Sequence, residues 1–467
     1  MLNLCSIFAT LHSKYMKKNN CIRFVIILLV SVSIQAQTKK WTLEECVKYA
    51  IDNNISIKQT ELDTKTANIG KKDAIGNFIP SLNSNASHSW NIGLNQDITT
   101  GLLRNQTTQF SSFGAGIGFD IYKGMQNQNT LRRANLSIIA AKYQLTKMQE
   151  DVALNVANAF LQVLFNKENL KVQQEQKANN EKQLFRSEEL VKAGSVPRGD
   201  LLDIKATVAS DAQRVVTAEN DLLISKLSLA QLLQLKEFYD FDITDDTSVK
   251  DENNILAQTP IAVYDKAKEQ RTELKIAKTN LEIAEKNVAI AKGGFQPTLQ
   301  GFYNINTRIS YADTFDFQTG AAQPAAPFGQ QFLDNKGQTF GAQLSIPVFN
   351  GWSVKNNVER SKVNLEKSKI AVEQEELTLQ RNVYTAFTDA KGGLNAYESA
   401  LSALEARQEA YNYAKERYAV GMMNSFDFNQ SQTLFTVAQS EVLRTKYDYI
   451  FKIKILEFYF GIPIIKN

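Results

Sequence analysis

Two stretches of the chain alternate apolar residues with other residues at a period of two. The apolar positions are Phe113, Ala115, Ile117, Phe119 and Ile121 in the first stretch, and Phe340, Ala342, Leu344, Ile346 and Val348 in the second. Such alternation is typical of a β-strand with one apolar and one polar face. Together with two weaker stretches of the same kind, it predicts four strands, at about 81–95, 109–122, 297–311 and 339–349.

The remainder of the chain has mainly helical periodicity. Thr42 and Glu45 have the spacing of a capping box and predict a helix over 42–75. Residues 125–193 contain neither proline nor glycine, and their apolar residues recur every three or four positions. This predicts a single coiled-coil-like helix roughly 100 Å long. A short segment with glycine and proline ends it, and a returning helix is expected over roughly 200–235.

The chain contains this pattern twice. Ala50, Gly76 and Pro80 reappear 217 positions later, and beyond a longer loop Val156 and Phe160 reappear 227 positions later. The two long helices have equal lengths between their flanking glycines, as a coiled coil requires, because an insertion would shift its seam. The expected organisation is a signal peptide at 1–36, a first repeat at 37–235, an acidic linker at 236–259 and a second repeat at 260–467.

The N-terminal region has the features of a secretory signal peptide. Lys17, Lys18 and Arg23 precede an apolar run over 24–34, and a small residue, Ala36, follows. We expect cleavage after Ala36; the alternative is a buried strand or helix at the start of the chain. The apolar run is too short to span a bilayer.

Few residues offer chemistry for catalysis or metal binding. Removal of the signal peptide would take away Cys5 and Cys21, which leaves Cys46 without a disulfide partner and predicts no lipid anchor. His88 is the single histidine of the expected mature chain, so no metal site is predicted. The sequence shows no phosphate-binding loop and no nucleophile–base pair. We therefore expect neither an enzyme nor a cofactor.

The net charge of +4 is spread along the chain, which argues against nucleic acid as a partner. Four amphipathic strands cannot close a membrane barrel alone, because lipid satisfies no free backbone hydrogen bond and such barrels have eight or more strands. The chain should therefore oligomerise: a dimer would give a filled eight-stranded barrel and a trimer an open one. The small polar residues of the second face fit a water-filled lumen. The alternative is a soluble sandwich edge or a helix-covered sheet.

Several motifs together resemble the TolC-type outer membrane efflux proteins. They are the signal peptide, the duplicated helix–strand–strand–long helix–helix repeat, and the segments 76–82, 293–299, 345–351 and 418–421. The resemblance implies a mainly α fold with a small β part. Three chains would share a twelve-stranded barrel, and their helices would form a long periplasmic coiled-coil tunnel.

The resemblance also implies a function and partners. The protein would be the outer-membrane exit duct of a tripartite efflux or type I secretion system, with its helices in the periplasm. It would meet a periplasmic adaptor protein and an inner-membrane pump of RND or ABC type, and its barrel would contact outer-membrane lipid. The alternative function is a periplasmic helical protein with a structural or ligand-binding role and no channel.

Site residues follow from the resemblance by position. The periplasmic gate and lumen ring would consist of Asp200, Asp203, Tyr418, Asp427 and Gln430. The adaptor-contacting turns would consist of Gly194, Ser195, Val196, Gly421, Met422 and Met423. Well-known family members have an arginine where this chain has Met423 and an aspartate where it has Gln430, which puts the arginine lock of the closed entrance in doubt. Asp203 is a candidate to replace part of the missing negative charge.

Simpler roles remain open for these residues. Asp200 and Asp427 lie in the first turn of a helix, where the free N–H groups and the dipole favour an acid. Tyr418 is equally compatible with packing inside a coiled coil. In the barrel, we expect the lipid-facing residues to be Phe113, Ile117, Phe119, Phe340, Leu344 and Ile346. The lumen-facing residues are expected to be Gly114, Gly116, Gln343 and Ser345.

Overall fold

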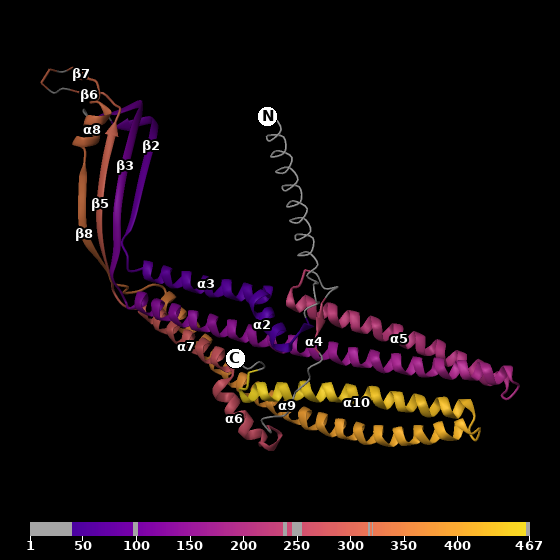
Figure 1. Cartoon of the computed structure of the whole chain (residues 1–467). Helices are drawn as coiled ribbons and strands as arrows, with labels where there is room; N and C mark the ends of the chain where they lie inside the picture. Colours follow the sequence, from indigo (N-terminus) through magenta and orange to yellow (C-terminus); the bar gives the residue numbers. More distant parts are fainter. Residues whose placement is uncertain are drawn as a thin grey trace, which may run out of the picture.

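The computed structural model describes residues 40–96, 101–236, 241–244, 255–315, 318–319 and 321–463. The predicted signal peptide at 1–36 lies outside these ranges. A four-stranded sheet stands at one end of a long layer of helices, and two helical hairpins extend from the other end (Figure 1). In the part of the chain that the structure describes, no helix is both long and apolar enough to cross a membrane.

The elements follow the predicted duplication. The first repeat contains β1 (Lys40–Trp41), α2 (Leu43–Asn53), α3 (Ile55–Gly76), β2 (Ser81–Gln96), β3 (Leu103–Lys123), α4 (Gln126–Lys192) and α5 (Arg198–Leu233). The second contains α6 (Pro260–Gln270), α7 (Thr272–Gly293), β5 (Thr298–Ser310), β6 (Thr314–Phe315), β7 (Ala322–Gln323), α8 (Phe328–Asp334), β8 (Gly337–Ser345), α9 (Ser353–Ala419) and α10 (Ser425–Phe460). Corresponding helices have equal lengths of 11, 22, 67 and 36 residues. The duplicated, mainly helical fold is confirmed.

The prediction of one unbroken helix over 42–75 was wrong. The capping box of Thr42 and Glu45 is present, but the helix stops at Asn54, whose backbone is extended (φ −60°, ψ 132°). The Asn54 side chain accepts a hydrogen bond from the Ser56 N–H and donates one to the Leu232 carbonyl of α5. The asparagine therefore caps α3 and ties the break to a neighbouring helix, a tertiary contact that periodicity does not reveal.

Arg271 occupies the corresponding break between α6 and α7, with nearly the same backbone angles. Its side chain is only 4% exposed and donates hydrogen bonds to Glu273 (2.9 and 3.1 Å) and to Glu150 of α4 (3.0 Å). The guanidinium lies 3.8 Å from the centroid of the Phe458 ring. One buried cation thus joins α4, α7 and α10.

Two strand boundaries differ from the expected ones. The polar loop expected at about 96–109 is mostly strand, because β3 starts at Leu103 and pairs with β2 up to Gln96. The last strand ends at Ser345, four residues early. Pro347 follows two positions later, and a proline has no N–H to donate to a strand ladder.

The predicted acidic linker at 236–259 is partly attached to the helices. Asp242 and Ile243 form β4, which pairs in parallel with β1. The Asp242 carboxylate contacts Lys226 (3.0 Å) and Lys167 (3.7 Å). This part of the linker therefore packs on α4 and α5 by charge as well as by its short strand.

Two apolar clusters hold the helices together near the middle of the layer. The first joins α2, α4 and α5 through Val47, Val156, Phe160, Leu229 and Leu233. The second joins α6, α7, α9 and α10 through Val263, Leu274, Val383, Ile453 and Leu456. Each fully buried side chain of this size contributes about 1.5–3 kcal/mol of transfer free energy. The apolar seam predicted for the long helix is confirmed over this part of α4.

Candidate functional site

The sheet has two chemically different faces. Its strands are antiparallel in the order β2-β3-β5-β8. Pairing across the sheet forms one row from Leu82, Ile117, Tyr303 and Phe340. The next row, whose side chains point to the opposite face, consists of Asn83, Gly116, Asn304 and Thr339. The register therefore places the residues predicted to face lipid on one face and those predicted to face the lumen on the other.

Glycines on the polar face leave room for asparagine side chains. A Cβ built at Gly114 would lie 2.8 Å from Asn85 Oδ1, and one at Gly116 would collide with Asn304 Oδ1. The alternating glycines of β3 therefore leave space for asparagine side chains from both neighbouring strands, β2 and β5. These amides make this face of the sheet polar.

Within the described residues, β2 and β8 each pair along one side only. Unpaired strand edges expose N–H and C=O groups that must find partners before the sheet can sit in lipid. The two edges run antiparallel to one another, since four antiparallel strands alternate in direction. They are thus geometrically suited to pair with the opposite edges of further copies of the chain.

The short helix α8 covers the part of the apolar face farthest from the helices. Gln331 accepts a hydrogen bond from the Ser310 N–H and donates one to the Ser310 carbonyl, as a neighbouring strand would. Phe328 and Phe332 lie against the ring of Phe113, which is half-buried as a result. Contact with lipid stays a prediction for all six residues of the apolar face; among them, α8 partly covers Phe113, and Ile346 lies just beyond the end of β8.

At the opposite end of the molecule, both helical hairpins close with the same turn (Figure 1). Gly194 and Gly421 have positive φ angles of 69° and 75°. In each turn the next residue, Ser195 or Met422, donates its N–H to the carbonyl five positions back, at 2.9 and 2.8 Å. This is the Schellman motif, which requires the left-handed conformation that glycine adopts most readily.

The predicted gate residues lie just behind these turns. The Asp427 N–H donates to Asn424 Oδ1 (2.8 Å), and Asn424 Nδ2 donates to the Asp427 carboxylate (3.0 Å). Asp427 thus takes part in the cap of α10, as the simpler interpretation expected. Its carboxylate remains exposed, as do the side chains of Asp203 and Gln430, while Asp200 is half-buried in the first turn of α5.

Tyr418 packs inside its own hairpin. Its ring stacks on Phe428 of α10 with centroids 4.6 Å apart and an interplanar angle of 13°. Tyr411 stacks on Phe435 in the same hairpin at 5.2 Å. The aromatic ladder holds α9 against α10 close to the turn, so a packing role is present, and a gate role for Tyr418 stays a prediction.

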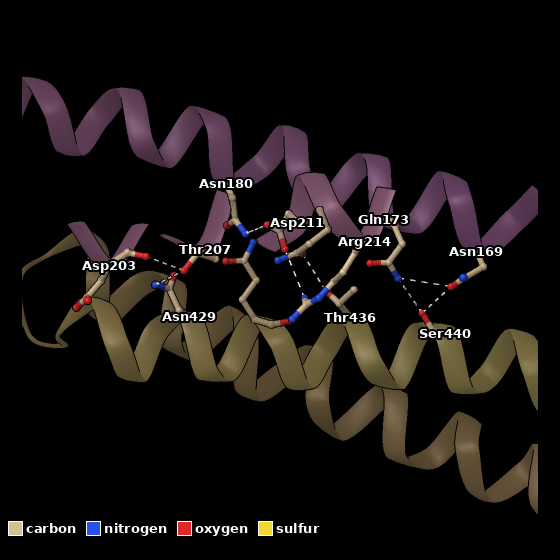
Figure 2. A network of polar contacts seen from close by, with 12 residues as sticks. Asn169, Gln173, Asn180, Asp203, Thr207, Asp211, Arg214, Asn429, Thr436 and Ser440 are labelled. Atoms are coloured by element: carbon tan, nitrogen blue, oxygen red, sulfur yellow. Dashed lines mark hydrogen bonds and ion pairs between the residues drawn. The ribbon is translucent and has the colours of Figure 1, made fainter. Parts of the chain in front are cut away.

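Between the apolar clusters and the turns, α4 packs against α10 through polar side chains (Figure 2). Thr436 donates to Gln176 Oε1 at 2.7 Å with both side chains buried, and Ser440 contacts Asn169 Oδ1 at 3.0 Å. Hydrophobic periodicity did not predict this seam. Its signal was visible, because polar residues occupy the heptad positions that apolar residues hold earlier in the same helix.

The comparison with protein families decides the identity. The model described as outer membrane efflux protein matches residues 47–234 and 263–454. The chain belongs to the outer membrane efflux protein family. The two matched segments correspond to the two structural repeats, and membership makes the chain an outer-membrane protein of a channel-forming efflux family. No curated protein matches the sequence.

Solved structures of efflux channels share the fold. The chain superposes on CusC with a TM-score of 0.75 at 17% identity, covering 90% of this chain and 91% of that one. The CmeC outer membrane channel of Campylobacter jejuni gives 0.71 at 18% identity, with 90% and 85% covered. The MtrE outer membrane channel of Neisseria gonorrhoeae, in its open state, gives 0.70 at 16% identity, with 92% of both chains covered.

Helix α5 adds a buried carboxylate beside the polar contact between α4 and α10. Asp211 of α5 is 2% exposed and accepts hydrogen bonds from Asn180 of α4 and from Arg214 (Figure 2). Two buried acceptors nearby on the facing helices, Asn180 Oδ1 and Gln432 Oε1, have no hydrogen-bond partner. Burial raises the pKa of Asp211 above its ordinary value, although Asn180 and Arg214 act in the opposite direction.

Replacing Asp211 with asparagine should therefore change how stability depends on pH. A raised carboxyl pKa means that this group binds its proton more tightly in the folded protein than in the unfolded chain, so its contribution to stability is greatest at low pH. It falls as pH rises from about 4, the unfolded value, through the folded pKa. Thermal unfolding between pH 4 and 8 should show this loss in the wild type and a flatter profile in Asp211→Asn. Asp203→Asn, an exposed control, should follow the wild type, and parallel profiles for all three proteins would contradict the prediction.

Proposed function

We propose that the protein is the outer-membrane exit duct of a tripartite efflux or type I secretion system. It would conduct substrates passively from a periplasmic adaptor and an inner-membrane pump of RND or ABC type to the exterior. The observation that carries the proposal is the amphipathic four-stranded sheet with two free edges, attached to a helical layer far longer than the sheet. A sheet of this kind is complete only as part of a shared, closed wall.

A homotrimer accounts for this geometry. Three copies would contribute twelve strands, enough for an open barrel, whereas two copies would give eight and a filled one. The polar face with its asparagines and alternating glycines would line the water-filled lumen, and the apolar face would meet outer-membrane lipid. The helices would then extend into the periplasm as a continuous tunnel.

The two hairpin turns are the proposed contact with the adaptor. Gly194, Ser195, Gly421 and Met422 are exposed at the end of the molecule opposite the sheet. Val196 and Met423 are half-buried beside them and would complete the surface. Because each chain has two similar turns, a trimer would expose six similar turns at this end. Such a surface suits an adaptor that also binds in several copies.

Heat-modifiable trimers and conductance test the proposal. Purified protein should migrate as a trimer on a denaturing gel before boiling and form ion-conducting pores in planar bilayers. A soluble monomer released with the periplasmic fraction would instead support the alternative of a periplasmic structural or ligand-binding protein.

Asp427 offers a more specific test at the proposed entrance. Three copies of this exposed carboxylate around one axis would attract cations, so Asp427→Ala should weaken both cation selectivity and block by divalent cations in single-channel recordings. Asp427→Asn should have the same effect, because it removes the charge and keeps an acceptor for the Asn424 amide. Unchanged block in both variants would leave Asp427 with its capping role alone.

A further inference from the structure

A groove of about 520 Å³ lies between α8 and the apolar face of the sheet. Helix α8 stands at the end of the sheet farthest from the helical layer (Figure 1). The volume falls within the range of about 300–1,000 Å³ that is typical of ligand pockets. Lys336 is the one charged residue of the described lining, which is mainly apolar and includes Ala86, Phe113, Ala115, Ile305 and Phe332.

The outer side of α8 is itself apolar. Phe328 and Leu333 are 49% and 60% exposed, although the helix already packs Phe332 against Phe113. Exposed apolar surface is unfavourable in water and favourable in hydrocarbon. A short helix that lies on one apolar surface and presents another therefore fits the boundary region of a bilayer, as interfacial helices do.

Aromatic side chains indicate the depth of the groove. Trp90 and Tyr311 are 60% and 43% exposed, and both pack on His88 with ring centroids 4.2 and 5.6 Å away. Trp90 pairs with Gln109 of β3, which is four residues farther from the helices than Phe113. Tryptophan and tyrosine concentrate at membrane–water interfaces. The groove thus lies just inside such an interface, where headgroups meet acyl chains.

Lys336 places a positive charge at the same level. It lies between α8 and β8, its side chain is exposed, and it lines the groove. It forms no ion pair with any residue that the structure describes. Asp334, the nearest acidic residue along the chain, is not part of the lining. An unpaired ammonium group beside an apolar groove matches a lipid that has a phosphate on its headgroup and an acyl chain below it.

We propose that this groove binds an acyl chain of a phosphorylated glycolipid of the lipid A type, with Lys336 contacting the phosphate. The inference rests on the proposed outer-membrane channel. If the helices extend into the periplasm, the α8 end of the sheet faces the outer leaflet, where such glycolipids are placed. The inference adds one defined lipid site, which general contact between a barrel and a membrane does not require.

Native mass spectrometry of the full-length protein with purified lipid A tests the site. Lys336→Gln should lower the retained lipid A about fivefold, the contribution of one lysine beside an anionic lipid surface. Lys336→Arg keeps the charge and should retain lipid A as the wild type does. Ala115→Phe fills the groove and should lower retention at least as much. Ala342→Phe is its matched control, because it adds the same ring to the same face on β8, outside the groove.

Trimer formation and conductance, measured on the same preparations, separate this inference from the proposed function. Conducting trimers that retain lipid A equally in all variants overturn the lipid site and leave the channel intact. A wild type without trimers or conductance overturns both. Equal losses from Ala115→Phe and Ala342→Phe overturn the groove as the binding place, and equal retention of phosphatidylglycerol by the wild type overturns the choice of a glycolipid.

Discussion

Replacing Ile117 with lysine is expected to remove most of the folded protein from the outer membrane. Ile117 lies in β3, six residues before the end of the strand, in an apolar row with Leu82, Tyr303 and Phe340. If this face meets lipid, a lysine there costs up to about 2–4 kcal/mol in each chain, depending on its depth in the bilayer. The measurement is the amount of heat-modifiable trimer in the outer-membrane fraction at equal expression.

Asn304→Lys is the matched control for this experiment. Asn304 pairs with Gly116, the neighbour of Ile117, so its side chain lies at nearly the same depth on the opposite face. A lysine there would enter the proposed lumen, remain hydrated and alter conductance with little effect on insertion. Equal losses from the two variants would contradict the assigned orientation of the sheet, and a larger loss from Asn304→Lys would reverse it.

Removal of the Arg271 side chain is expected to be the most destabilising single change in the helical layer. Its guanidinium is buried between Glu150 and Glu273 and rests on the Phe458 ring. Burial favours a raised pKa for Glu273, but the hydrogen bonds and charge of Arg271 outweigh it and hold the pKa below its ordinary value. Arg271→Ala would leave this carboxylate buried without its cation, at a cost of about 3–5 kcal/mol.

Lys268 supplies the control, because it lies one turn earlier and pairs with Glu376 in a much more exposed ion pair. Exposed ion pairs contribute little to stability, so Lys268→Ala should shift the thermal transition far less. Combining Arg271→Ala with Glu150→Gln and Glu273→Gln should recover part of the loss, since the buried charges are then gone. If Arg271→Ala and Lys268→Ala shift the thermal transition equally, burial of the Arg271 ion pairs adds nothing to stability beyond an exposed pair.

Sequence periodicity correctly predicted the strands and the two long helices, because their patterns repeat along the chain. Alternation revealed the strands, and the constant spacing of Gly124 to Gly194 and Gly351 to Gly421 revealed the equal long helices. These signals depend only on neighbouring residues and on the duplication. The breaks at Asn54 and Arg271 were not predicted because the tertiary partners of their side chains, the Leu232 carbonyl and the Glu150 carboxylate, are distant in sequence.

The candidate site was recoverable from sequence only in part. The positions of the turns followed from their glycines, and the two faces of the sheet followed from alternation. The stacking of Tyr418 on Phe428 and the polar seam around Asp211 depend on how separate helices align, which local spacing does not determine. Polar residues at heptad positions, such as Gln176 and Asn180, were the available clue.

The polar contact between α4 and α7 has a consequence for how the two repeats are held together. These helices belong to one chain, so their contact forms within one molecule and does not depend on protein concentration. Their association needs little apolar area, which frees positions such as Glu150 and Thr272 for hydrogen bonding. A contact between the corresponding helices α9 and α3 of two separate copies would have no such tether, so it would need more apolar area to form.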